Sequence, residues 1–165
     1  MKILSIDAST KSSGWSVFED GKLIDYGCIT SSSTDMIKRI QIMIKGLSQV
    51  LTNHNITTIV LEEVRPENGL QNIKTHRALM YLQAAIAFLV HESSPSTDIE
   101  FIYPSEWRKI CGIKTGSGVK RDTLKVADVK FVKDNYGIDV NDDIADAIGI
   151  GHAWTRRNQP EPSAW

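Results

Sequence analysis

Hydrophobic and polar positions along the first 30 residues predict three short strands. Ile3, Leu4 and Ile6 form an apolar run that ends at Asp7. Two further strand-like segments, 13–19 and 22–30, flank the dipeptide Asp20-Gly21. Asp-Gly between two such segments is typical of a tight hairpin, because both turn positions tolerate positive φ angles. The pattern therefore indicates an antiparallel meander of three strands.

Beyond residue 30, segments with helical periodicity alternate with β-branched runs. We expect helices at 34–53, 72–91, 104–111, 120–136 and 142–156, and further strands at 57–64 and 99–103. Ser33 or Thr34 can cap the first helix, and Asn141 or Asp142 the last. This order predicts an α/β fold with a five-stranded mixed sheet, the meander plus parallel strands, and helices on both faces. The first and fourth strands should be parallel neighbours at its centre.

The length of the chain indicates one domain, and its overall composition excludes several classes. With 165 residues we expect a single domain over 1–156 and a short flexible tail over 157–165. Only two cysteines occur, Cys28 and Cys111, which excludes a disulfide framework or a thiolate-only zinc site. The chain shows no signal segment and no membrane-spanning run, so we expect a soluble, cytoplasmic protein.

The net charge of −1 gives no overall case for nucleic-acid binding, but the charge is unevenly distributed. Between residues 104 and 133, eight basic residues face three acidic ones, which leaves this segment at +5. The basic residues are Arg108, Lys109, Lys114, Lys120, Arg121, Lys125, Lys130 and Lys133. Such a segment suits phosphate contacts. A solvated helix face is the alternative, and we prefer it for Lys125, Lys130 and Lys133.

Acidic residues inside apolar segments give the clearest chemical signal. Asp7 follows an apolar run in the first strand, and Glu62 follows Ile59-Val60-Leu61 in the fourth. If these strands are neighbours, both carboxylates lie near the C-terminal ends, where open α/β sheets place their sites. Asp143 and Asp146 are three residues apart, hence on one face of the last helix.

Four carboxylates from three segments suit hard divalent cations, Mg²⁺ or Mn²⁺. Two such ions can orient a water and stabilise the leaving oxygen of a phosphodiester. Each acid alone has a simpler explanation, since Asp7 can end a strand and Asp143 can cap a helix. Their combination is what favours a metal site.

Three segments, MKILSIDASTKSSGWSVFEDGKLIDYG, VLEEV and DDIADAIGIGHA, resemble the RuvC Holliday-junction resolvases of the RNase H-like superfamily. The resemblance runs from Lys2 to Trp154, and the short length is similar to phage-encoded members. It implies an RNase H-like fold and a homodimer that nicks branched DNA, leaving 5′-phosphate ends. It also implies two Mg²⁺ ions per site, held by residues that match the family's acids: Asp7, Glu62, Asp143 and Asp146.

The resemblance also implies which basic residues contact DNA. Lys120 follows the glycine-rich segment, where the resolvases carry a basic residue near the active site, so we expect it to stabilise the scissile phosphate. The other candidates for DNA contact are Arg65, Lys74, Arg77, Trp107, Arg108, Lys109, Lys114 and Arg121. Trp107 can stack on a base or anchor the core. Arg65 stands where cellular members often carry an aromatic residue, which favours a broader choice of branched substrates.

Other functions remain open on the sequence alone. The opening Ile6-Asp7-Ala8-Ser9-Thr10 also resembles the phosphate-binding segment of actin-like ATPases and of the TsaB group. A nuclease for RNA–DNA hybrids shares the four acids, and a DNA-binding module without catalysis would keep only the basic segment. The helix at 72–91 is apolar on more than one face, so it either forms a dimer interface or is buried in the monomer. We doubt that His152 is a metal ligand and expect Cys111 to pack.

Overall fold

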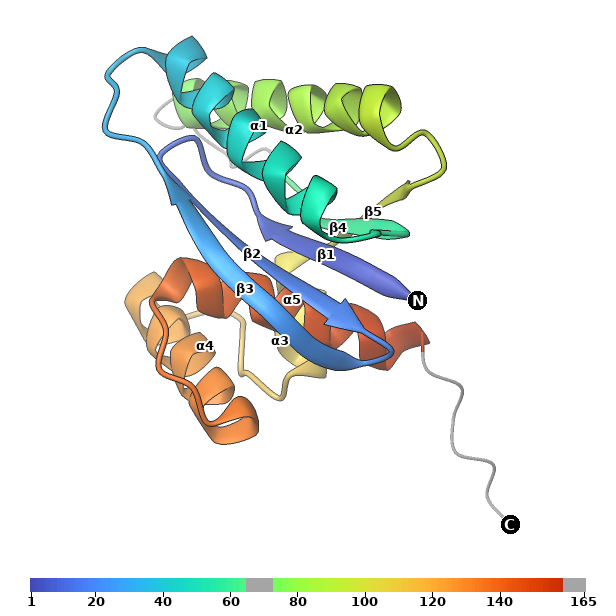
Figure 1. The fold of residues 1–165 in the computed structure, drawn as a ribbon. Coiled ribbons are helices and arrows are strands. Elements are labelled where there is room, and N and C mark those ends of the chain that lie inside the picture. Colours follow the sequence, from blue (N-terminus) through green and yellow to red (C-terminus); the bar gives the residue numbers. More distant parts are fainter. Residues whose placement is uncertain (65–72, 159–165) are drawn as a thin grey trace.

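The computed structural model describes residues 1–64 and 73–158, in which one sheet lies between two helical layers (Figure 1). The strands are β1 (Lys2–Asp7), β2 (Ser12–Glu19), β3 (Lys22–Thr30), β4 (Thr58–Glu62) and β5 (Asp98–Ile102). The helices are α1 (Met36–Asn53), α2 (Ile73–Ser93), α3 (Pro104–Ile110), α4 (Arg121–Tyr136) and α5 (Asp142–Asn158). The fold is the predicted α/β arrangement.

The sheet has five strands in the order β3-β2-β1-β4-β5. The strands β1, β2 and β3 form the antiparallel meander, and β4 and β5 add in parallel to β1. At the β2–β3 turn, Asp20 has φ of 48° and Gly21 of 82°, as an Asp-Gly hairpin requires. The expected central pair of parallel strands, first and fourth in the chain, is confirmed.

Alternation along the central strands sends side chains to two separate cores. Leu4 and Ile6 of β1 pack in the core under α1 and α2. Ile3 packs in the core under α3, α4 and α5, together with Val60 of β4. Because side chains alternate along a strand, Asp7 shares a face with Ile3, and Glu62 shares a face with Val60. Both acids therefore face the layer that contains α5.

Most element boundaries differ from the predicted ones by one or two residues, and three of these differences have a clear consequence. Helix α1 begins at Met36 because Asp35, not Ser33 or Thr34, is its cap and accepts a 3.0 Å hydrogen bond from the Lys38 amide. Strand β4 ends at Glu62, two residues earlier than expected. Helix α5 continues to Asn158, so the first two residues of the expected tail are helical and the rest lie outside the described residues. No helix in the described ranges is long and apolar enough to cross a membrane.

Candidate active site

The C-terminal ends of β1 and β4 bring the first two candidate acids together. Ile6 pairs with Leu61 in the parallel ladder, so Asp7 and Glu62 are the next residues on adjacent strands. Asp7 and Glu62 are both partly buried, and burial is the main cause of their raised pKa values. Burying two carboxylates side by side is unfavourable unless a positive charge joins them.

Helix α5 supplies the other two acids because it packs closely across β1 and β2. The hydroxyls of Ser5 and Ser16 lie 2.8 and 3.0 Å from the Ala147 carbonyl oxygen, inside the core. Gly14 lies opposite Asp7 in the sheet, and a Cβ there would come within 1.8 Å of the Asp143 carbonyl oxygen. Only glycine lets the first turn of α5 approach the sheet in this way.

Burial and mutual repulsion raise the pKa values of three of the acids. The pKa of Asp7 is raised to about 8 by burial and then by the charges of Glu62 and Asp143. The pKa of Asp146 is raised to about 9 by burial, by Asp7 and by Asp128. Burial also raises the pKa of Glu62. Three carboxyl groups that resist ionisation at one place indicate a site that lacks positive charge.

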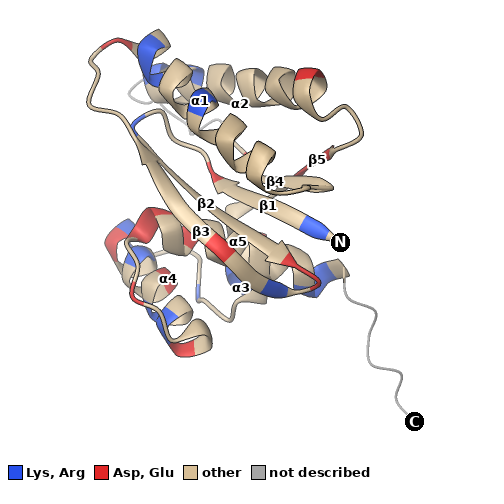
Figure 2. Ribbon diagram, in the orientation of Figure 1, with Lys and Arg blue, Asp and Glu red and all other residues tan. Residues whose placement is uncertain are grey.

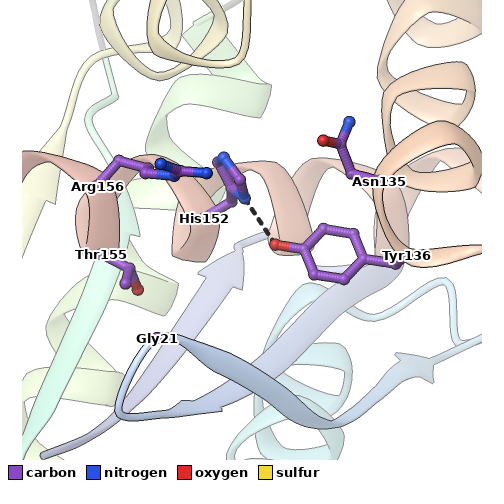
Figure 3. Close-up of a pocket in the computed structure, with 6 residues that line it drawn as sticks. All are labelled: Gly21, Asn135, Tyr136, His152, Thr155 and Arg156. Atoms are coloured by element: carbon purple, nitrogen blue, oxygen red, sulfur yellow. Dashed lines mark hydrogen bonds between the residues drawn. The ribbon is translucent and has the colours of Figure 1, made fainter.

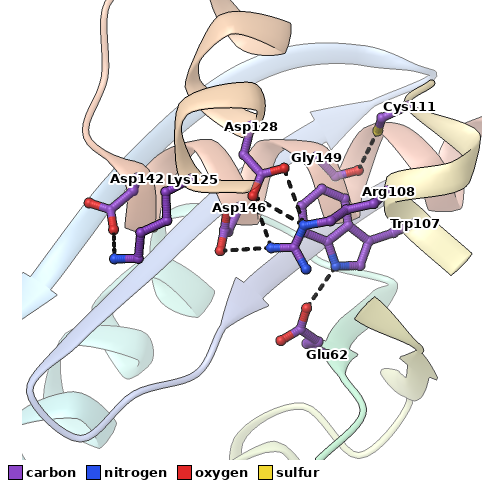
Figure 4. Close-up of polar contacts among 9 residues, drawn as sticks. All are labelled: Glu62, Trp107, Arg108, Cys111, Lys125, Asp128, Asp142, Asp146 and Gly149. Carbon is purple, nitrogen blue, oxygen red and sulfur yellow. Dashed lines mark hydrogen bonds and ion pairs between the residues drawn. The ribbon is translucent and has the colours of Figure 1, made fainter. Parts of the chain in front are cut away.

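The carboxylate of Glu62 is oriented by a residue that we expected to contact DNA. The indole Nε1 of Trp107 donates a 2.7 Å hydrogen bond to Glu62 Oε1 (Figure 4). The Trp107 side chain is 0% exposed, so it has no surface to offer a base, and the stacking prediction is wrong. Trp107 anchors the core instead, where it packs against Gly149. From the other side of the sheet, Gln83 donates to the Glu62 carbonyl oxygen at 3.0 Å.

A fifth acid, Asp128, was not among the sequence candidates. It lies on α4, is 1% exposed, and accepts a fork of hydrogen bonds from Arg108 (Figure 4). The same guanidinium lies 3.4 Å from Asp146 Oδ2. The sequence held a signal for this residue: Asp128 interrupts the apolar line formed by Leu124 and Val132 at four-residue spacing.

Asp143 and Asp142 have partners of different kinds. The Ser12 hydroxyl, from the start of β2, donates to Asp143 Oδ2, and the Cys28 thiol lies 3.2 Å from the same hydroxyl. Asp142 pairs with Lys125, which lowers the pKa of the Asp142 carboxyl (Figure 4). The negative charge of Asp142 is therefore balanced by Lys125 of the same chain.

The residues present fit a divalent cation, although the side chains do not form a closed ligand set. In the described part of the chain, no three Asp, Glu, His or Cys side chains lie close enough together to hold a metal ion. However, Asp146 Oδ1 is buried without a hydrogen-bond partner, and the charges of Asp7 and Asp128 act on the same carboxyl group. Such oxygens are the ligands that Mg²⁺ prefers. Contacts with Trp107 and Arg108 account for the present orientation of Glu62 and Asp146.

Ion pairs divide the basic segment into two groups. Arg108, Lys125, Lys130 and Lys133 pair with acids of the chain. The remaining four are exposed and make no ion pair with any described residue: Lys109, Lys114, Lys120 and Arg121. Figure 2 shows basic positions on α4 beside the acidic start of α5. The charge of Arg121 reaches Glu62, since it lowers the pKa of that carboxyl.

The candidates on α2 are only partly described. Lys74 and Arg77 are exposed on its first turns. Arg65 lies outside the described residues, so its role stays a prediction from sequence.

A separate pocket of about 330 Å³ lies near the far end of α5 (Figure 3). Its lining includes His152, whose Nδ1 is 2.6 Å from the Tyr136 hydroxyl, and Arg156. Burial and the Arg156 charge lower the pKa of His152. His152 thus belongs to this pocket and not to the acidic cluster. Cys111 is partly buried, and its thiol lies 3.5 Å from the Gly149 carbonyl oxygen.

The family model described as crossover junction endodeoxyribonuclease RuvC matches residues 3–152. The chain belongs to the RuvC family. RuvC proteins from two Pseudomonas putida strains, F1 and W619, are 23% and 24% identical over 158 residues, covering 93% of this chain and 87% of theirs. The family's enzymes are metal-dependent nucleases, and the alternative of an actin-like ATPase is not favoured.

Solved structures agree with the RuvC fold. RuvC of T. thermophilus in complex with a Holliday junction matches with a TM-score of 0.74 and 14% identity, covering 96% of this chain and 97% of that one. The Fowlpox virus resolvase, also with Holliday junction DNA, matches with a TM-score of 0.56 and 16% identity, covering 94% of this chain and 99% of that one. These likenesses confirm the predicted RNase H-like architecture.

Proposed function

We propose that this chain is a structure-selective endonuclease that cleaves Holliday junctions and other branched DNA at the acidic cluster of β1, β4 and α5. The observation that carries the proposal is that Asp7, Glu62 and Asp146 are partly buried and have raised pKa values, because the chain supplies too little positive charge to balance them. The family match supplies the reaction class, hydrolysis of a DNA phosphodiester. Branched DNA is the substrate bound by the resolvases of similar fold.

The carboxylates would hold two Mg²⁺ ions, for which Mn²⁺ is a possible substitute. Asp7 would be a shared ligand, because it is flanked by Glu62 and by the first turn of α5. Asp146 would contribute its unpartnered Oδ1, and Asp143 would complete the set. When bound, the ions supply the positive charge that activates water and stabilises the leaving oxygen. Trp107 and Ser12 act by orienting Glu62 and Asp143.

The four unpaired basic side chains are proposed to hold the DNA backbone. Lys120 and Arg121 begin α4 beside the acids, so we assign Lys120 to the scissile phosphate and Arg121 to its neighbour. Lys109 and Lys114 extend the phosphate-binding surface, and Lys74, Arg77 and Arg65 add contacts from the side of α2. We expect the protein to act in the cytoplasm, that of the bacterial host cell if the chain is phage-encoded.

A homodimer formed through α2 would present two active sites to opposing strands. Tyr81, Met80 and Phe88 of α2 are 49%, 47% and 66% exposed, although Leu82 and Ile86 are buried in the monomer core. An exposed apolar surface on the outer side of a helix whose inner side packs in the core supports an interface. Sedimentation of the wild-type chain and of Phe88→Glu tests it, since the variant should be monomeric and folded.

The direct test of the function is cleavage of matched synthetic four-way, three-way, flap and linear duplex DNA in Mg²⁺. We expect nicking of the branched substrates with 5′-phosphate ends and little cleavage of the linear duplex. Asp7→Asn should remove cleavage while leaving junction binding in EDTA intact, and Asp142→Asn is the matched control. Cleavage by the Asp7→Asn protein at the wild-type rate would refute the assignment.

A further inference from the structure

Arg108 is held inside the acidic cluster by three different helices. On α3 its guanidinium carbon lies 4.1 Å from the Trp107 ring centroid. On α4 the buried Asp128 accepts hydrogen bonds from Nε at 3.1 Å and from Nη2 at 2.9 Å. On α5 Asp146 Oδ2 lies 3.4 Å from Nη2. The side chain is only 12% exposed, so this cation belongs to the interior of the site and not to its surface.

The Arg108 charge acts on the same carboxyl groups that would bind metal. It lowers the pKa of Asp7, of Glu62 and of Asp146, and so opposes the rise caused by burial. It therefore supplies part of the positive charge that the cluster otherwise lacks. A divalent ion at the same carboxylates would be repelled by the guanidinium and would share Asp146 with it.

One edge of the guanidinium remains available. Nε and Nη2 are engaged by Asp128 and Asp146, whereas Nη1 donates to no group in the part of the chain that the structure describes. A planar guanidinium fixed on one edge by a carboxylate can still donate from the other edge to a phosphate oxygen. A DNA phosphate that enters the site can therefore draw Arg108 away from Asp146 while Asp128 keeps it in place.

We propose that Arg108, positioned by Asp128, weakens divalent-ion binding in the free enzyme by occupying Asp146, and that a DNA phosphate relieves this competition. The inference rests on the proposed function, because it assigns the metal site to the same acids. It makes metal binding and DNA binding strengthen each other through one side chain, so that the enzyme acquires its full metal complement only on DNA. Arg108 and Asp128 are positioning residues in this arrangement.

The first experiment measures Mn²⁺ binding to the DNA-free protein by the electron paramagnetic resonance signal of free Mn²⁺. Arg108→Gln should bind Mn²⁺ about tenfold more tightly than wild type, which is within the usual range of coupling between sites. Arg108→Lys keeps a cation for the buried Asp128 and so protects the fold. Because the lysine ammonium lacks the fork geometry that lets a guanidinium contact Asp128 and Asp146 together, the Mn²⁺ affinity of Arg108→Lys should lie between those of the wild type and Arg108→Gln. Lys109→Gln, which removes the adjacent exposed charge, should stay within about twofold of wild type.

The second experiment uses reciprocity between the two ligands. Junction affinity is measured by fluorescence anisotropy in EDTA and in Ca²⁺, and the ratio reports the coupling. The ratio should fall in Arg108→Gln and stay at the wild-type value in Lys109→Gln, although both variants lose one basic charge. A purely structural role for Arg108 would not change this ratio.

The outcomes separate the two proposals. If the wild type binds Mn²⁺ but both Arg108 variants bind it with unchanged or lower affinity, the competition is refuted and the metal site stands. If neither the wild type nor Arg108→Gln binds Mn²⁺, the metal site and the inference fail together. Tighter binding by both variants with a reduced coupling ratio supports the inference.

Discussion

The two ends of α5 both carry polar side chains into the protein, but only the first leaves charge without a partner. At the far end, Trp154 Nε1 donates to Glu100 at 2.8 Å, and Arg157 pairs with the same carboxylate at 3.0 Å. His152 and Tyr136 form a hydrogen bond with each other nearby. At the first end, Asp146 keeps a buried oxygen without any partner, and its pKa is raised to about 9.

The difference shows how to separate a structural polar cluster from a functional one. Buried polar groups in a stable fold are normally satisfied by the chain itself. The far end follows this rule, so its groups need nothing from outside. The first end breaks it, and the missing charge is positive, which is what a bound divalent cation would supply. Arg108 is the internal exception, since it supplies part of that charge.

The largest expected effect comes from removing one acid at the first end. Asp146→Asn should lower the rate of junction cleavage in Mg²⁺ by about a thousandfold or more, because metal ligands act as a unit with the rest of the site. His152→Phe, six residues along the same helix, should leave the rate within about twofold, since it loses only a structural hydrogen bond. Single-turnover cleavage measures both. A large loss in the His152 variant would remove the distinction between the two ends.

The close approach of α5 to the sheet gives the next effect. Gly14→Ala should destabilise the protein by about 1–3 kcal/mol, because the new Cβ collides with the Asp143 backbone. It should also lower cleavage by displacing the acids. Gly151→Ala collides with Ser5 and Phe18 further along the helix, so it should cost similar stability but less activity. Urea unfolding measures the stability of the two variants, and cleavage assays at a temperature where both stay folded measure their activity. Equal losses of activity in Gly14→Ala and Gly151→Ala would contradict this prediction.

The raised pKa values predict how stability depends on pH without metal. Asp7 and Asp146, with pKa values of about 8 and 9, hold protons in the folded state that their unfolded forms lose near pH 4. Stability of the metal-free protein should therefore fall as pH rises from about 4 to about 9. Mg²⁺ binds the ionised forms, so it should raise the melting temperature more at pH 9 than at pH 6. Calorimetry in EDTA and in Mg²⁺ measures these melting temperatures. A Tm of the metal-free protein that rises between pH 4 and pH 9 would contradict the prediction.

The smallest effect belongs to the far end. Glu100→Gln removes the carboxylate that Trp154 and Arg157 share at the protein surface, and it should cost about 1 kcal/mol or less. Mn²⁺ affinity and cleavage rate should not change. A measurable loss of metal binding in this variant would mean that the two ends are coupled along α5.

The sequence was sufficient for the three-strand meander, for the central pairing of the first and fourth strands, and for the elements that carry the four candidate acids; their role as metal ligands stays a prediction. Asp7 and Glu62 each end an apolar strand, and the spacing of Asp143 and Asp146 places them on one helical face. The family resemblance was carried by these same short segments, and the family match confirms it.

The remaining features depend on contacts between distant segments. Gly14 was not recognised, because its requirement comes from a helix that begins more than a hundred residues later. For Trp107 the sequence left base stacking and core anchoring open, because its neighbours are basic whereas its burial under α5 is a tertiary property. Arg108 was expected to contact DNA, but its pairing with Asp128 inside the protein was missed, although Asp128 interrupts an apolar line on α4.

The most direct test of the central claim is the position of Mn²⁺ in crystals of the wild-type protein bound to junction DNA, located by anomalous scattering. The account predicts anomalous peaks bound by Asp7, with Glu62, Asp143 and Asp146 completing the ligands, and a guanidinium of Arg108 that has moved away from Asp146. It predicts no peak at the His152 pocket. Mn²⁺ sites only outside the acidic cluster, in crystals where the cluster is accessible and the pH is above 8, would contradict it.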